Sequence, residues 1–184
     1  VYFGNQAGLW AYEQTESGGV IRCVPQVWGP VYAIEGQEVE GSVELWLGMD
    51  GMVAHGEGGV FSFEAIPESL PGPVWALAVD GERVAAQTTD GVAIRGASGV
   101  WSRVDFCEEL DLAVPAFRPD SPVGFWSSVT YSGIWVGITW VNQRLYVGVQ
   151  GRVIDINPAG SACTEMCRSE DPQNYHAVQG IADQ

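Results

Sequence analysis

Few side chains in this sequence could support acid–base or nucleophilic chemistry. There are only two histidines, His55 and His176, and no Gly-x-Ser-x-Gly motif that would present a serine for acyl transfer. Both histidines border expected strands, where packing is a commoner role than catalysis. Glutamates such as Glu57 and Glu64 are frequent, but acidic residues are spread along the whole chain, so no carboxylate pair suited to glycoside cleavage stands out. We therefore expect no catalytic residues and no enzyme activity.

The four cysteines, Cys23, Cys107, Cys163 and Cys167, could bind a metal or form disulfides. The spacing of Cys163 and Cys167, even with His176 nearby, does not fit a zinc knuckle, and no fourth ligand is evident. No calcium-binding loop of the Asp-x-Asp-x-Asp-Gly kind is present either. We expect no metal and no cofactor. An even number of cysteines favours disulfides and an oxidising compartment, either extracellular, at the cell surface or periplasmic.

The net charge and the lengths of the apolar runs exclude two classes of partner, nucleic acids and the membrane interior. Twenty-three acidic residues face eight basic ones, which gives a formal net charge of −15. Such a charge repels phosphate backbones, so we expect no nucleic-acid partner. No apolar run reaches the roughly 18 residues that a spanning helix needs, so we expect no membrane insertion. The chain starts at Val1 without a basic region and an apolar region after it, which indicates a trimmed chain or a fragment.

The elements that must position any site come from an internal repeat. Four segments each read as an apolar strand, a tight turn with glycine, and a second apolar strand. Their turn glycines, Gly8, Gly51, Gly91 and Gly151, lie 43, 40 and then 60 residues apart. Asp-Gly pairs in two of these turns are typical of hairpins whose central residues take positive φ. The only stretch that could hold a short turn of helix is 107–112.

The repeat predicts an all-β protein, a four-bladed β-propeller formed as one domain over residues 1–184. The chain begins with what reads as the second strand of a blade and ends, over 175–184, with what reads as a first strand. A split closing blade formed by the two termini would remove the exposed sheet edge. The expected parts are blade 1 from 175–184 plus 1–25, blade 2 from 31–67, blade 3 from 74–106, an insertion at 107–132 and blade 4 from 133–167.

Two alternatives to the closed ring remain. The chain could be part of a longer propeller, or its last strand could complete a blade of a neighbouring molecule and give a polymer.

The motif Leu45-Trp-Leu-Gly-Met-Asp-Gly-Met-Val53, with Val31-Tyr-Ala-Ile-Glu35 before it, resembles the repeats of bacterial two-component-regulator propellers. The other three repeats depart from this motif, and blade 1 has Ala7-Gly8 where Asp-Gly is expected. The resemblance implies a propeller architecture. Because such propellers serve as sensors, lectins, scaffolds and enzymes, it does not imply one function.

The ring also suggests which cysteines pair. Blade 4 would neighbour both blade 3 and blade 1, whereas Cys163 and Cys167, four residues apart in one strand, would be separated by about 13 Å, too far to bond. We therefore expect Cys107 and Cys23 each to pair with one of them.

Candidate binding residues are aromatic or charged side chains in loops and turns. Trp28 and Trp126 are expected in connecting loops, Trp140 near a strand end, and Arg118 in the insertion, where function commonly concentrates. Asp50 and Asp90 occupy equivalent turns and could attract a cation, although ordinary turn roles are commoner.

These features favour a non-catalytic secreted module that binds a protein or glycan ligand or copies of itself, with polymerisation by strand exchange as one form. The alternatives are a propeller-type glycan hydrolase or lyase, and a sensor domain of a larger receptor.

Overall fold

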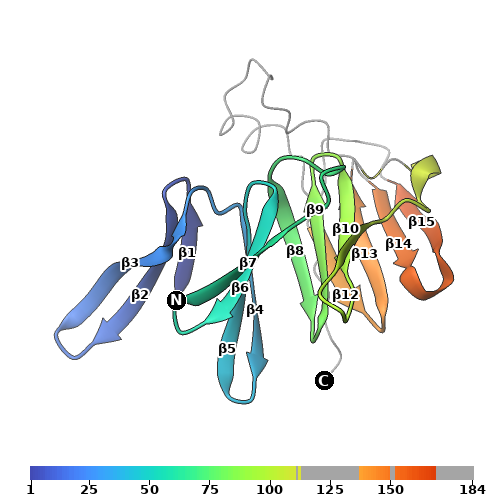
Figure 1. Ribbon diagram of the computed structural model, residues 1–184. Helices are drawn as coiled ribbons and strands as arrows, with labels where there is room; N and C mark the ends of the chain where they lie inside the picture. Colours follow the sequence, from blue (N-terminus) through green and yellow to red (C-terminus); the bar gives the residue numbers. More distant parts are fainter. Residues whose placement is uncertain (111, 113–136, 150–151, 169–184) are drawn as a thin grey trace.

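A computed structural model describes residues 1–110, 112, 137–149 and 152–168. Within these residues the chain forms 15 strands in four antiparallel sheets, which follow one another in sequence order across the molecule (Figure 1). Within each sheet, every strand pairs with the next one along the chain, so every sheet is a meander. An all-β chain of repeated sheets is what the sequence predicts, and the arrangement is propeller-like.

The first sheet has three strands, and the other three sheets have four each. The first consists of β1 (Tyr2–Asn5), β2 (Gly8–Thr15) and β3 (Gly18–Trp28). The second consists of β4 (Ala33–Val39), β5 (Ser42–Gly48), β6 (Met52–Glu57) and β7 (Val60–Ala65). The third consists of β8 (Val74–Asp80), β9 (Arg83–Thr88), β10 (Gly91–Arg95) and β11 (Trp101–Arg103). The fourth consists of β12 (Gly137–Val141), β13 (Arg144–Val149), β14 (Arg152–Asn157) and β15 (Ala162–Arg168).

Apart from the strands, the described residues contain two short 3-10 turns, Glu108–Leu110 and Pro158–Gly160. The first lies within the stretch where the sequence predicts a turn of helix. In the part of the chain that the structure describes, no helix has the length and apolar character needed to cross a membrane.

Alternation along the strands buries both faces of the inner sheets. In β5, Leu47 packs toward the first sheet and Trp46 toward the third, because successive side chains point to opposite faces. Buried apolar clusters accordingly fill all three junctions between consecutive sheets. The protein therefore has a repeated core, one layer for each junction, in place of a single central one.

The hairpin turns differ from the expected type. Gly51 takes a positive φ of 66°, but neither Asp50 nor Asp90 does, so the Asp-Gly pairs do not form turns with two central residues at positive φ. In the third sheet Gly91 pairs directly with Thr88, which places Asp90 inside the turn and its glycine in the strand. The prediction of hairpins at these points is confirmed, whereas the predicted backbone geometry is wrong.

The described sheets do not close into a ring. The first and fourth sheets lie at opposite ends of the row in Figure 1, and no strand pairing or buried cluster among the described residues joins them. Strand β1 pairs with β2 on one side, and no described strand pairs with its other edge. The closing strand expected over 175–184, and most of the insertion expected over 107–132, lie outside the described residues.

Candidate functional site

Three of the predicted binding residues lie at one end of the sheets. Asp50 follows β5 and Asp90 follows β9, while Trp28 is the last residue of β3, in register with Gly8 at the start of β2. We call this end, where β5 turns into β6 and β9 into β10, the turn end. Trp28 ends a strand where a loop position was expected, and 73% of its surface is exposed.

Beside these residues, an aromatic pair bridges the second and third sheets at the turn end. The rings of Tyr32 and Trp75 meet edge to face with centroids 5.0 Å apart. The indole Nε1 of Trp75 donates a hydrogen bond to Thr89 Oγ1 at 3.1 Å. Burial raises the pKa of the Tyr32 hydroxyl, and the negative charge of Asp50 raises it further. The Tyr32 hydroxyl therefore stays protonated over the physiological pH range.

Trp140 lies elsewhere, toward the opposite end of the fourth sheet. It is half-buried on β12 and packs against the cluster between the third and fourth sheets. The guanidinium of Arg83 lies 5.4 Å from the centre of the Trp140 ring. The indole Nε1 of Trp140 is buried and has no hydrogen-bond partner among the described residues. Arg118 and Trp126 lie outside the described residues, so the structure does not place them.

A group of titratable side chains bridges the second and third sheets. His55 on β6 lies between two carboxylates, with Nδ1 at 3.3 Å from Glu44 Oε1 and Nε2 at 3.1 Å from Glu64 Oε1. Glu64, on β7, also accepts hydrogen bonds at 2.8 Å from both Nε and Nη2 of Arg95, on β10. The indole of Trp101, on β11, donates to the same carboxylate at 2.7 Å. We call Glu44, His55, Glu64, Arg95 and Trp101 the bridging cluster.

Aromatic packing holds the histidine of the bridging cluster in place. The imidazole of His55 stacks on Trp46 with centroids 4.3 Å apart and planes 11° from parallel. On the Glu44 carboxylate, both Gln37 and Trp46 donate hydrogen bonds to Oε2, at 2.6 and 3.2 Å. The side chain of His55 is 21% exposed.

Charge and hydrogen bonding keep both glutamates of the cluster ionised. For Glu64, hydrogen bonds from Arg95 lower the pKa more than burial raises it, and Trp101 lowers it further. For Glu44, burial is the largest influence and raises the pKa, but the hydrogen bonds from Gln37, Trp46 and His55 together bring it below its ordinary value. Both carboxylates are bonded to partners within the fold. Glu44 bonds within the second sheet, and Glu64 ties the second sheet to the third through Arg95 and Trp101.

Sequence reasoning did not find the bridging cluster. His55 was expected to have a packing role, but nothing in the spacing of Glu44, Glu64 and Arg95 links them before the strand register is known. Arg144, on β13, bonds Asp155 of its own sheet through Nε at 2.7 Å. Among the described residues, no set of three or more histidine, cysteine, aspartate or glutamate side chains is arranged to hold a metal ion.

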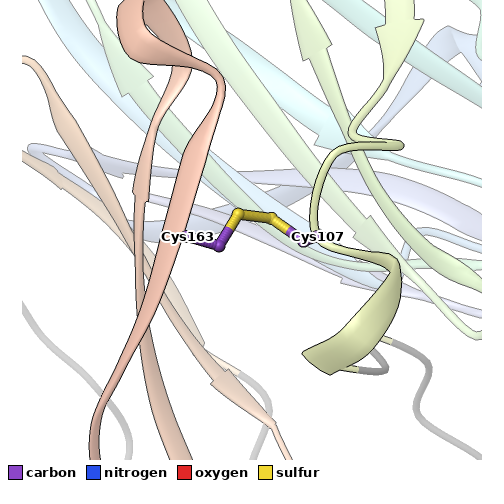
Figure 2. The surroundings of a disulfide bond; sticks show 2 residues. All are labelled: Cys107 and Cys163. Atoms are coloured by element: carbon purple, nitrogen blue, oxygen red, sulfur yellow. A yellow bond between two sulfur atoms is a disulfide. The ribbon is translucent and has the colours of Figure 1, made fainter.

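A disulfide ties the third and fourth sheets together. Cys107, just after β11, bonds Cys163 on β15, with Cα atoms 5.7 Å apart (Figure 2). One of the two expected bonds is thus present. Cys23 and Cys167 are free thiols, so the second expected bond is not made in this structure. The physical reason is distance, because Cys23 and Cys167 belong to the two sheets at opposite ends of the row.

The comparisons with known proteins bear on the fold. No protein-family model and no curated protein matches the sequence. Among solved structures, the chain resembles the extracellular domain of the hybrid two-component system BT4673 of B. thetaiotaomicron, with a TM-score of 0.54 and 14% identity over 90% of this chain and 20% of that one. It also resembles AztD of Citrobacter koseri, with a TM-score of 0.56 and 15% identity over 94% of this chain and 45% of that one. The chain therefore spans a fifth of the first structure and less than half of the second.

Proposed function

We propose that this chain is a non-catalytic binding or assembly module that acts outside the cytoplasm. The observation that carries the proposal is the exposed indole of Trp28 at the turn end, on a framework of packed sheets. An exposed tryptophan is a large, rigid contact surface that both glycan and protein ligands use. Meanwhile the groups best suited to acid–base chemistry, His55 and its two glutamates, are bonded within the fold.

Location and class have separate support. The Cys107–Cys163 bond favours an oxidising compartment, either extracellular or periplasmic. One of the similar structures is itself an extracellular domain of a two-component system, which favours a sensor domain as the alternative within the same class.

The test of ligand binding uses Trp28→Ala and a glycan microarray as the probe. We expect the wild-type chain to bind a subset of the arrayed glycans, and Trp28→Ala to lose at least about tenfold in apparent affinity, because removing a stacked aromatic costs about 1.4 kcal/mol or more. Phe63→Ala is the matched control, since Phe63 is also an exposed aromatic, at 48%, but lies within β7 of the second sheet. Equal binding by Trp28→Ala and wild type would overturn the assignment of the site.

The non-catalytic part of the proposal has its own readout. Each bound glycan is incubated with the protein and analysed by mass spectrometry for shortened or unsaturated products. Release of either product would establish the competing proposal, a glycan hydrolase or lyase.

The assembly part of the proposal rests on the open edge of β1. We propose that the four sheets are propeller blades and that a strand from residues 178–184 pairs with this edge, either within one chain or between chains. A free strand edge is a template for such pairing. Light scattering of the wild-type chain separates the two forms, because closure within one chain gives a monomer and strand exchange gives a polymer that deletion of 175–184 would abolish.

A further inference from the structure

Each junction between sheets uses the same two kinds of face. The second sheet packs Leu47 and Ala54 against the first sheet, and Trp46 and Val53 against the third. In register, Gly48 lies opposite Val53 and faces the third sheet, where a Cβ atom on this glycine would come within 2.6 Å of the Val74 carbonyl oxygen. Every sheet therefore has a backward face, toward the preceding sheet, and a forward face, toward the following one.

The backward face of the first sheet has no described partner. Phe3, Trp10 and Cys23 lie side by side on it, because they are paired in register across β1, β2 and β3. Their neighbours Leu9 and Gly4 point the other way, onto the second sheet, where Gly4 lies against Val31. The backward face is thus a row of apolar side chains with one thiol.

The backward face of the first sheet is more exposed to solvent than the backward face of the second sheet. Phe3 is 38% exposed, whereas Leu47, at the same register position of β5, is fully buried. Val1 and Ile21, which flank the row, are 84% and 59% exposed. An exposed apolar sheet face of this kind marks an interaction surface.

The forward face of the fourth sheet is the equivalent face at the other end of the row. Val147 and Ile154 pack into the cluster shared with the third sheet, so Gly148 and Val153, paired with each other, lie on the opposite face. Gly148 holds the register position that Gly4 and Gly48 hold in their own sheets, where each glycine lies against a residue of the next sheet. Cys167 lies opposite Val153 on β15 and is exposed. The two unpartnered thiols are therefore placed one on each end face.

We infer that the backward face of the first sheet receives the forward face of the fourth sheet of a second copy of this chain, and that Cys23 and Cys167 then form an intermolecular disulfide. This deepens the assembly part of the proposed function and rests on it. A second copy is favoured because the two end faces of one chain lie at opposite ends of its row of sheets (Figure 1).

Existing geometry within the chain supports the disulfide. Cys107, just after the outermost strand of the third sheet, already bonds Cys163 on the outermost strand of the fourth, with Cα atoms at 5.7 Å. Cys23 and Cys167 are also on the outermost strands of their sheets, β3 and β15. When they bond, the two thiols lose two protons and two electrons, and a disulfide of the oxidising compartment accepts both and leaves as two thiols.

The experiment mixes two single variants, Cys23→Ser and Cys167→Ser, with an oxidised-glutathione redox buffer as the disulfide source. The contact is head to tail, so each variant alone has only one kind of reactive thiol, on faces that do not meet. The mixture restores one Cys23 and one Cys167 on different chains. We expect at least about tenfold more disulfide-linked dimer on non-reducing gels from the mixture than from either variant alone, because docking raises the local thiol concentration.

Three other outcomes would overturn the inference. Equal cross-linking by each variant alone would indicate random collision. A wild-type monomer with an internal Cys23–Cys167 bond, found by peptide mapping, would indicate a ring closed within one chain. No cross-link in the mixture, with both variants folded by circular dichroism, would mean that the faces do not meet. Phe3→Ser should reduce cross-linking of the mixture, and Phe63→Ser should not. Glycan binding through Trp28 is unaffected by any of these outcomes, so the two proposals fail separately.

Discussion

Glu64→Gln tests whether the bridging cluster holds the second and third sheets together. The substitution keeps the size of the side chain but removes the charge that Arg95 and Trp101 contact at 2.8 and 2.7 Å. The new amide can accept hydrogen bonds through one oxygen only, and its NH2 group would face an N–H donor of Arg95 or Trp101. Arg95, whose side chain is 16% exposed, would then lack its carboxylate in a largely buried position.

The expected loss in the free energy of unfolding is about 2–3 kcal/mol. Hydrogen bonds to charged groups contribute about 1.5–3 kcal/mol each, and breaking a fully buried ion pair costs about 3–5 kcal/mol. The side chains of Glu64 and Arg95 keep 21% and 16% exposure, so the pair lies between the buried and the surface case, where the median is about 0–1 kcal/mol. Solvent screening therefore places the estimate below the buried range.

The same prediction has a pH dependence whose sign follows from the lowered pKa of Glu64. A carboxyl group with a lower pKa in the folded protein stabilises the fold at pH values above its unfolded value of about 4.3. This contribution is lost as the pH falls through the folded pKa. The difference between wild type and Glu64→Gln should be constant near neutral pH, shrink below about pH 4.3 and disappear at still lower pH.

Urea unfolding monitored by tryptophan fluorescence measures both effects, since Trp46 and Trp101 lie at the cluster. Glu57→Gln is the matched control, because Glu57 is an exposed glutamate at the end of β6, and its change should stay within about 0.5 kcal/mol. A loss no larger than that of the control, or one that persists unchanged at pH 3, would refute the structural role given to Glu64.

Two further predictions concern the junctions between sheets. Gly48→Ala should lower the free energy of unfolding by about 1–3 kcal/mol, because its Cβ would lie 2.6 Å from the Val74 carbonyl oxygen. Gly36→Ala, whose Cβ would meet nothing nearer than 3.6 Å, is the control in the same urea assay. Cys163→Ser should cost about 4 kcal/mol, from the loop entropy of a bond that spans 56 residues. Reduction of the wild-type chain with dithiothreitol should reproduce that loss and leave Cys163→Ser unchanged.

The strands and their order could be predicted from sequence, because alternation and turn residues are local signals. The hairpins that contain Asp50 and Asp90 are where the sequence places them. A bond from Cys107 to one of Cys163 and Cys167 could also be anticipated, since it needs only the order of the sheets, but the choice of Cys163 could not. The bridging cluster could not, because it depends on which face each side chain takes. A shift of one residue in register would move Glu64 away from Arg95.

Strand register shows which residues of two repeats are structurally equivalent, and alignment of the repeats on their turn glycines does not. Aligning the repeats on their turn glycines matches Gly48 with Thr88, since each lies three residues before its turn glycine. The strand pairing instead matches Gly48 with Gln87, because Gly48 pairs with Val53 and Gln87 with Val92. Four residues separate Gly48 from Val53, and four also separate Gln87 from Val92, so the two hairpins have the same length. The alignment is offset by one residue because Gly51 lies inside its turn, whereas Gly91 is the first residue of β10.

This corrected position explains a buried polar residue that alignment leaves unaccounted for. Gln87 is fully buried and occupies the place where other sheets have a glycine in close contact with the next sheet. A long side chain cannot allow the same close approach, so its amide Nε2 instead donates to the Gly148 carbonyl of the fourth sheet at 3.2 Å. The junction between the third and fourth sheets thus replaces backbone contact with a hydrogen bond. It is also the junction that carries the disulfide.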